Sequence, residues 1–161
     1  MKKFLVLIFV FFATDFAFAQ KQMPNITLTS DANKSYNVKN DFSEKDKLYV
    51  FAFWATWCAP CLNELDAINQ YYAAWSTELN MELIAVSIDD TRTQKRVKPL
   101  LNGKNWTYKI LLDTNQDLKR ALGIANVPHT IVVKNQKIVY VHNGYSQGAE
   151  MELYNKLKEL K

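Results

Sequence analysis

The chain contains two cysteines, Cys58 and Cys61, and they stand three positions apart. Thiols at this C-x-x-C spacing on the first turn of a helix are close enough to form a disulfide with each other. The N-terminus of a helix also favours negative charge, so one of the two can be a thiolate near neutral pH. The residue types and their spacing therefore favour reversible thiol–disulfide chemistry.

Two other interpretations of the cysteine pair stay open, a structural disulfide and half of a zinc site. A bridge that closes so short a loop would restrict the unfolded chain very little. A zinc site needs about four ligands, whereas the chain has no second C-x-x-C and only two histidines, His129 and His142.

A strand and a helix must position the two cysteines. Leu48–Trp54 is a short, nearly continuous apolar run, which is typical of a strand buried on both faces. Pro60 falls in the first turn of the helix that follows, where its missing N–H costs nothing. Apolar residues at spacings of three and four then predict a helix of about five turns. Its buried stripe would consist of Leu65, Ile68, Tyr72, Trp75 and Leu79.

The same patterns predict the other elements. Further strands are expected at 26–28, 36–38, 81–88, 108–112, 130–133 and 138–141. Further helices are expected at 93–101, 115–122 and 147–160. Asp113 or Thr114 would cap the second of these helices, and Gly123 would end it. Strands alternate with helices up to Leu122, which predicts parallel strand pairs with helices on both faces. The last two strands would add an antiparallel hairpin at one edge.

Residues 1–19 have the layout of a secretory signal peptide. Two lysines precede an uninterrupted apolar run at 4–13, and Ala17-Phe18-Ala19 supplies an A-x-A cleavage signal. The apolar run is much shorter than the about 20 residues of a spanning helix, and Asp15 follows it, so cleavage is favoured over an uncleaved membrane anchor. The mature chain would be one domain, residues 20–161, exported to the periplasm, where disulfides are permitted.

The formal net charge of +4 comes from basic residues spread along the chain, with a mild local excess from Arg92 to Lys98. A solvated helix face explains that excess better than a nucleic-acid-binding surface does. We therefore expect no nucleic-acid partner.

Three segments carry a family resemblance. Residues 53–61 resemble the active-site run of thioredoxin-like proteins, and 127–130 are similar to their second signature, whose proline is held in cis. Between them, 85–90 resembles a strand end of the exported TlpA-like branch, which includes cytochrome c maturation reductants. The resemblance covers about residues 26–161. It implies an α/β fold with a thioredoxin-like mixed sheet flanked by helices, an N-terminal hairpin and a helix–strand insertion at 93–112.

Three positions place the chain within this resemblance. Ala52 stands where cytoplasmic thioredoxins carry a buried acid, and Glu64 stands where the TlpA-like branch often has a glutamate. His129 replaces the usual threonine after the cis proline. A carboxylate at Glu64 could accept the proton of Cys61 or raise the thiol pKa values by like-charge repulsion. The alternative is a surface glutamate, stabilised by the helix dipole.

The expected catalytic residues are Cys58, Cys61 and Glu64. Cys58, at the helix N-cap, would be the exposed nucleophile that attacks a substrate disulfide. Cys61, one turn inside and more buried, would then attack Cys58 and release the substrate thiol.

The expected substrate-contact residues are Trp57, Pro60, Val127, Pro128 and His129. The resemblance implies that the backbone of Val127 pairs with a substrate strand beside the nucleophile, while Trp57 forms a wall of the groove. His129 should lie near the thiols. It could stabilise a thiolate, ligate a metal together with the two cysteines, or only line the groove.

The resemblance implies an exported thiol–disulfide oxidoreductase that acts on protein disulfides or thiols. We expect a monomeric reductant, re-reduced by a membrane electron donor, which needs no cofactor and no metal. Whether it serves cytochrome c maturation or reduces misformed disulfides stays open, as does the oxidant direction, because the dipeptide Ala59-Pro60 does not fix the potential. The alternative function is a copper-binding chaperone that uses Cys58, Cys61 and His129, although Sco-type chaperones space their cysteines one residue wider. The local motif of peroxidases is absent.

Overall fold

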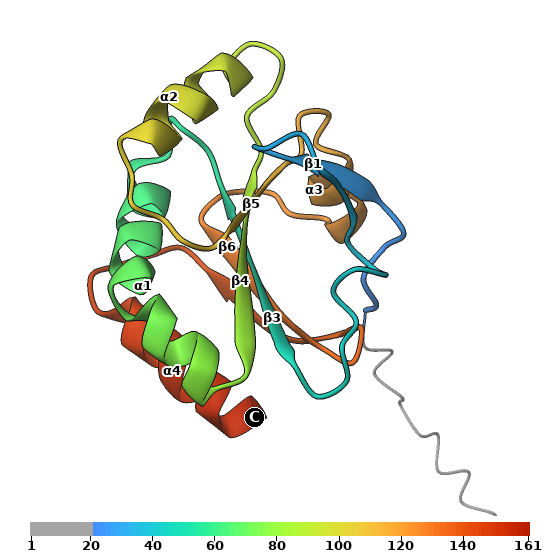
Figure 1. Ribbon diagram of the computed structural model, residues 1–161, viewed down its shortest axis with the longest axis vertical. Helices are drawn as coiled ribbons and strands as arrows, with labels where there is room; N and C mark the ends of the chain where they lie inside the picture. Colours follow the sequence, from blue (N-terminus) through green and yellow to red (C-terminus); the bar gives the residue numbers. More distant parts are fainter. Residues whose placement is uncertain (1–20) are drawn as a thin grey trace, which may run out of the picture.

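The computed structural model describes residues 21–161, so the signal peptide predicted at 1–19 lies outside the described residues. Within these residues, seven strands form one mixed sheet in the order β2-β1-β5-β4-β3-β6-β7 (Figure 1). The strands are β1 (Thr27–Ser30), β2 (Ser35–Asn37), β3 (Leu48–Trp54), β4 (Met81–Ser87), β5 (Lys109–Leu112), β6 (His129–Lys134) and β7 (Lys137–Asn143). The helices are α1 (Ala59–Glu78), α2 (Val97–Asn102), α3 (Asp117–Leu122) and α4 (Ala149–Leu160).

The centre of the sheet is parallel and its edges are antiparallel, as the sequence predicts. β3 pairs in parallel with β4, and β4 pairs in parallel with β5. The hairpin β1–β2 joins the β5 side, and the hairpin β6–β7 joins the β3 side, both antiparallel. Every residue of β3 is buried, which explains its continuous apolar sequence. The N-terminal hairpin and the inserted helix and strand agree with the fold that the resemblance implies.

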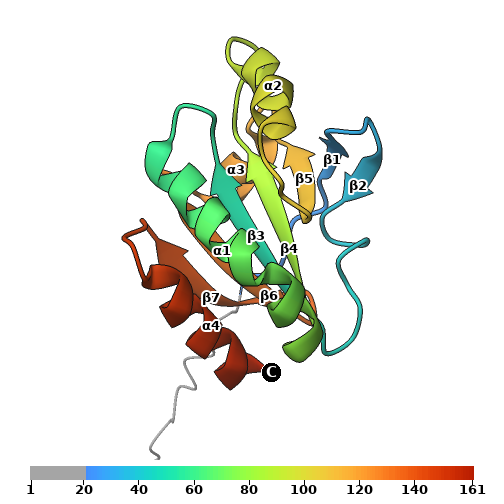
Figure 2. The same cartoon turned by 60° about the vertical axis from the view of Figure 1, so that its left-hand side comes forward.

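Helices cover both faces of this sheet. α1 and α4 lie side by side on one face, and α3 lies on the other (Figures 1 and 2). The predicted stripe of α1 points into the core, since Leu65, Ile68 and Trp75 are buried and Tyr72 packs against them. The core therefore fixes the rotation of α1, and with it the direction of the side chains in its first turns.

The segment predicted as a helix at 93–101 is instead a 3₁₀ turn, Gln94–Arg96, followed by the short helix α2. Pro99 explains the difference, because an α-helix that began at 93 would need a hydrogen bond from the N–H that Pro99 lacks. The start of α3 is also later than predicted, at Asp117. Gln116 occupies the N-cap position, but Asp113 provides the capping interaction: its carboxylate accepts hydrogen bonds from the backbone N–H groups of Leu118 and Lys119.

The carboxyl ends of the parallel strands meet at one edge of the sheet, and β3 leads from that edge into the two cysteines. A short turn separates Trp54, the last residue of β3, from the start of α1. None of the helices within residues 21–161 combines the length and the hydrophobicity needed to cross a membrane.

Candidate active site

The cysteines occupy the N-terminus of α1, as predicted. Cys58 is the N-cap residue and Pro60 is the second residue of the helix. The N–H of Cys58 donates to the carbonyl of Ala55 at 3.0 Å, which closes the turn from β3. Cys58 and Cys61 form a disulfide with their Cα atoms 5.3 Å apart. The free N–H groups of the first helical turn therefore surround the reactive pair.

The two cysteine residues differ in exposure in the expected order, but by less than expected. Cys61 is fully buried, whereas Cys58 keeps 5% of its surface exposed. The expectation of an exposed Cys58 is wrong for this disulfide form, in which the residue is buried. Little of Cys58 is therefore open to a partner in the disulfide form.

Glu64 is buried in the second turn of α1, with 4% of its surface exposed. The interpretation as a surface glutamate is therefore wrong. Thr130 donates a hydrogen bond from its hydroxyl to Glu64 Oε1 at 3.1 Å. Burial raises the pKa of Glu64 to about 7, while the hydrogen bond from Thr130 acts in the opposite direction. This carboxyl, three residues beyond Cys61, can gain or lose a proton near neutral pH.

Ala52 helps to explain why the buried acid comes from α1 rather than from the sheet. Ala52 lies opposite Thr130 in the β3–β6 register, and both are buried. Directly opposed residues of paired strands share one face of the sheet, so Ala52 faces α1 with Thr130. Its small side chain occupies the position at which cytoplasmic thioredoxins carry their acid.

The second predicted segment forms a loop between α3 and β6. The peptide bond Val127–Pro128 is cis, as the resemblance implies. Pro128 is buried and its carbonyl accepts a hydrogen bond from the N–H of Gly144 at 2.9 Å. Gly144 has a φ of +80°, a conformation that glycine adopts without strain. The end of β7 thus holds the proline loop in place.

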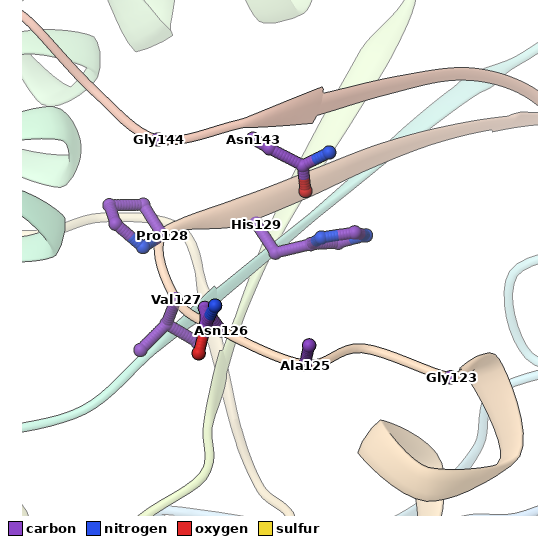
Figure 3. Close-up of a pocket in the computed structure, with 8 residues that line it drawn as sticks. All are labelled: Gly123, Ala125, Asn126, Val127, Pro128, His129, Asn143 and Gly144. Carbon is purple, nitrogen blue, oxygen red and sulfur yellow. The ribbon is translucent and has the colours of Figure 1, made fainter.

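This proline loop borders an open pocket of about 500 Å³ (Figure 3). Its lining combines small residues with amide and imidazole groups: Gly123, Ala125, Asn126, Val127, Pro128, His129, Asn143 and Gly144. The pocket is large enough to accept one side chain of a bound peptide.

His129 points into this pocket and not toward the cysteines. Its neighbour Thr130 reaches Glu64 on α1, and successive side chains of a strand point to opposite faces. The imidazole therefore lies on the other face, where its ring meets the edge of Phe53 at a centroid distance of 6.2 Å. Figure 3 shows it projecting away from Pro128, between Asn143 and Ala125. The expectation that His129 lies near the thiols is wrong.

Burial lowers the pKa of His129 from its usual value of 6.5, and a side-chain hydrogen bond with Asn143 only partly offsets this. The imidazole is thus mainly neutral at pH 7. Within the described part of the chain, no three His, Cys, Asp or Glu side chains are grouped so that they could hold a metal ion. The ligand set that the copper-chaperone alternative needs, both cysteines with His129, is not brought together.

The remaining predicted contact residues lie on the surface around the cysteines. Trp57 is 57% exposed beside Cys58, and Pro60 is exposed on the first turn of α1. Trp54 is fully buried and its ring meets the edge of Trp106 at a centroid distance of 5.3 Å. The exposed pair is therefore available to a partner, whereas Trp54 packs in the core.

One residue near the cysteines has no role in the sequence-based prediction. Asp89 follows β4 and is 2% exposed, and its carboxylate accepts a hydrogen bond from the backbone N–H of Thr56 at 2.8 Å. The sequence signal was an aspartate at the carboxyl end of a buried parallel strand, next to the strand that leads into the cysteines. Its partner lies 33 positions away and could not be identified without the fold.

Comparison with known proteins gives a family match over most of the chain. Residues 19–142 match the model of the AhpC/TSA family. Two similar curated relatives carry the name thiol-disulfide oxidoreductase ResA. The protein from Bacillus thuringiensis subsp. konkukian is 27% identical over 137 residues, which cover 84% of this chain and 76% of the relative. The protein from Bacillus anthracis is 28% identical over the same shares of both chains.

Solved structures show the same fold. An uncharacterized thioredoxin-like protein from Porphyromonas gingivalis is 42% identical, with a TM-score of 0.73 and coverage of 86% of this chain and 90% of that one. A putative thiol:disulfide interchange protein DsbE from Chlorobium tepidum matches with a TM-score of 0.76 at 18% identity, covering 88% and 96%. At that identity the second match bears on the fold alone.

Proposed function

This chain belongs to the AhpC/TSA family of thioredoxin-like proteins and is a thiol–disulfide oxidoreductase, and from that premise we propose that it is an exported reductant of protein disulfides. The observation that carries the proposal is the disulfide-bonded pair at the N-terminus of α1, with the buried carboxyl of Glu64 one turn further along the same helix. Cytochrome c maturation is the proposed pathway class, since the chain resembles reductants of that type.

The proposed reaction consists of two thiol–disulfide exchanges. In the reduced protein the Cys58 thiolate attacks one sulfur of a substrate disulfide, that disulfide breaks, and the departing substrate thiolate takes up a proton. Cys61 then loses its proton and attacks the Cys58 sulfur of the mixed disulfide. The mixed disulfide breaks, the second substrate thiol leaves, and the Cys58–Cys61 disulfide forms. The substrate gains two electrons and the protein loses two.

Glu64 is proposed as the acceptor of the Cys61 proton. Cys61 is fully buried, so water has little access to its thiol. A carboxyl whose pKa is raised to about 7 has an affinity for protons that suits transfer near neutral pH. The position of Glu64, three residues after Cys61 on the helix, places the two side chains on the same face.

The charges around the pair support the reducing direction. Dithiols become strong oxidants when their reduced, thiolate form is stabilised. Here neither Ala59 nor Pro60 carries a charge, and the first turn of α1 contains no basic residue. His129 is mainly neutral at pH 7 and faces away, while an ionised Glu64 disfavours a second negative charge on Cys61. These features favour the disulfide form, and therefore a low reduction potential.

The proposed substrate platform is the proline loop together with the exposed side chains beside Cys58. The backbone of Val127 would pair with an extended substrate segment, and Trp57 and Pro60 would flank it. The adjoining pocket, with His129 and Asn143 on its wall, would receive a substrate side chain. The proposed partners are protein disulfides or thiols and a membrane electron donor, and the protein is proposed to act as a periplasmic monomer.

The reduction potential tests the proposed direction. The purified protein is equilibrated with glutathione buffers and the fraction of the Cys58–Cys61 disulfide is measured. A potential well below about −200 mV is expected for a reductant, whereas a value near about −120 mV would identify an oxidant. Tight Cu(I) binding by the reduced protein without any disulfide exchange would contradict the oxidoreductase assignment itself.

A trapping experiment identifies the substrate. The variant Cys61→Ser can form the mixed disulfide but cannot resolve it, so it should retain partners through Cys58. The double variant Cys58→Ser, Cys61→Ser is the matched control and should retain none. Recovery of apocytochromes would support the proposed pathway class, and recovery of unrelated exported proteins alone would argue for a general reductant.

A further inference from the structure

Asp89 is a buried carboxylate that no step of the proposed reaction uses. It lies directly after β4 and accepts three hydrogen bonds. The backbone N–H of Thr56 donates to Oδ2 at 2.8 Å, the Thr56 hydroxyl donates to Oδ1 at 2.7 Å, and the Ser87 hydroxyl donates to Oδ2 at 2.9 Å. Both carboxylate oxygens of Asp89 therefore accept hydrogen bonds, and Thr56 donates two of the three.

That residue lies in the turn that presents the nucleophile. Thr56 stands between β3 and Cys58, two positions before the sulfur. At the start of the turn, the N–H of Ile88 donates to the carbonyl of Trp54 at 2.8 Å. At its end, Cys58 donates to Ala55. Among the side-chain hydrogen bonds of residues 21–161, those of Asp89 are the ones that reach the turn 55–58.

We propose that Asp89, through Thr56, is a positioning residue that fixes the direction of Cys58 against the N-terminus of α1. The stabilisation that a helix N-terminus gives to a thiolate falls off within one turn, so it depends on where the sulfur points. A turn held only by its backbone could shift the sulfur away from the free N–H groups. The inference rests on the proposed function, in which Cys58 is the attacking thiolate.

The charge of Asp89 by itself would act in the opposite direction. A nearby carboxylate disfavours a thiolate and raises the thiol pKa. Removing Asp89 would then lower the pKa of Cys58 if repulsion dominated, and raise it if positioning dominated. The sign of the change therefore separates the two effects.

Asp113 provides a matched control within the same sheet. It follows the neighbouring strand β5, is 1% exposed and also accepts hydrogen bonds, from the backbone N–H groups of Leu118 and Lys119. Those bonds hold α3 rather than the cysteine turn. Asp89→Ala and Asp113→Ala should both destabilise the fold. A difference between them in the pKa of Cys58 therefore reports on the hydrogen bonds to the cysteine turn and not on lost stability.

The test measures the alkylation rate of Cys58 by iodoacetamide from about pH 4 to pH 10, in the reduced mature chain carrying Cys61→Ser. Asp89→Ala and Thr56→Val are expected to raise the midpoint of the pH profile by about half a unit, or roughly threefold less thiolate below the midpoint. Thr56→Ser keeps both hydrogen bonds and should restore the wild-type midpoint. Asp113→Ala should leave it unchanged.

Several results would overturn the inference. Midpoints of Asp89→Ala and Thr56→Val equal to wild type would do so, as would a downward shift in Asp89→Ala and Asp89→Asn. If Asp89→Ala does not fold, the midpoint of Thr56→Val decides, since this variant removes the hydrogen bond from the Thr56 hydroxyl and keeps the charge of Asp89. A wild-type Cys58 with the ordinary thiol pKa of about 8.5 and no disulfide exchange would instead refute the proposed function.

Discussion

At the scale of single residues, Glu64 and His129 show how burial sets chemistry on the two faces of one strand pair. Thr130 binds Glu64 on the α1 side, while the adjacent His129 packs against Phe53 on the other side. Burial raises the pKa of the acid and lowers the pKa of the base, so in both cases it favours the uncharged form. At neutral pH the imidazole of His129 is therefore mainly neutral, and the carboxyl of Glu64 is close to half protonated.

Replacing Glu64 should slow the second exchange step. In Glu64→Gln the Cys61 proton loses its buried acceptor, so release of a trapped mixed disulfide is expected to slow by roughly a hundredfold. Stopped-flow tryptophan fluorescence can follow this step, since Trp57 lies beside Cys58. The wild-type rate should rise through about pH 7, in line with the pKa of Glu64. Asp66→Asn, on the same helix, is the control, and identical pH profiles for Glu64→Gln and wild type would exclude the role.

The same carboxyl should make stability depend on pH. The pKa of Glu64 is about 7 in the folded protein against 4.5 for an ordinary glutamate, so the folded state binds more protons between these values. Stability should therefore fall as pH rises from 4.5 to about 7 and then level off, by up to about 3 kcal/mol. Urea unfolding of the oxidised wild-type protein and of oxidised Glu64→Gln checks this. The contribution of His129 to the pH dependence is the same in both proteins, so it cancels in the difference between their stabilities. A flat difference across the range would refute it.

His129 is expected to affect substrate contact rather than the redox potential. Its NMR titration midpoint should lie below 6.5, since burial disfavours the imidazolium. Because the ring faces away from α1, His129→Gln should change the reduction potential by less than about 10 mV. It should nevertheless weaken binding of peptides that occupy the pocket beside Asn143. A potential shift of several tens of millivolts would show that His129 acts on the thiols.

At the scale of elements, the tight turn between β6 and β7 has an unusual sequence, Asn135-Gln136. Asn135 and Gln136 have φ values of 51° and 65°, which match a turn with two left-handed residues. Asn tolerates this conformation, and its side-chain oxygen also accepts a hydrogen bond from the N–H of Asp46 at 3.0 Å. Gln136 has no comparable tolerance, so its backbone is strained.

Gln136→Gly should therefore stabilise the protein by roughly 0.5–1 kcal/mol, since asparagine–glycine is the preferred pair for this turn. The bond from the N–H of Met23 to the carbonyl of residue 136 uses backbone atoms and should survive. Asn135→Gly is the contrasting variant, because it loses the bond to Asp46 and should not stabilise. Equilibrium urea unfolding measures both, and equal effects would contradict the explanation.

Local sequence patterns predict most of these elements because their causes are local. The buried stripe of α1, the apolar run of β3 and the cap at Asp113 follow from spacing and residue type, and the structure confirms them. The late start of α2 also has a local cause, Pro99, which the periodicity of the apolar residues does not reveal.

The parts of the site that could not be predicted depend on contacts between distant residues. Glu64 meets Thr130 across 66 positions, and Asp89 meets Thr56 across 33. The direction of His129 follows from the β6 register, which sequence alone did not fix. The reactive and titratable residues could therefore be identified from the sequence, but the face of the sheet that each one occupies could not.

At the scale of the whole molecule, export is the prediction with the widest consequences. Protein recovered from the periplasm should begin at Gln20, because the A-x-A signal ends at Ala19. Mass spectrometry of the N-terminal peptide checks this. Ala19→Arg should block cleavage and leave a larger precursor, whereas Gln22→Arg, beyond the signal, should not. A wild-type protein that retains residues 1–19 would contradict the prediction.

The first described residues make contacts that bear on the order of signal cleavage and folding. Gln22 forms a bridge to Lys137, the N–H of Ile138 donates to the carbonyl of Lys21, and the Lys21 ammonium reaches the carbonyl of Leu122. A peptidase that cuts after Ala19 must hold the chain on both sides of that bond, so these contacts cannot exist while it acts. On the proposed cleavage, the start of β7, at Lys137 and Ile138, is therefore covered only after processing. If the signal peptide is removed after Ala19, the new N-terminus would pair with this strand as a late step, after the protein has left the membrane.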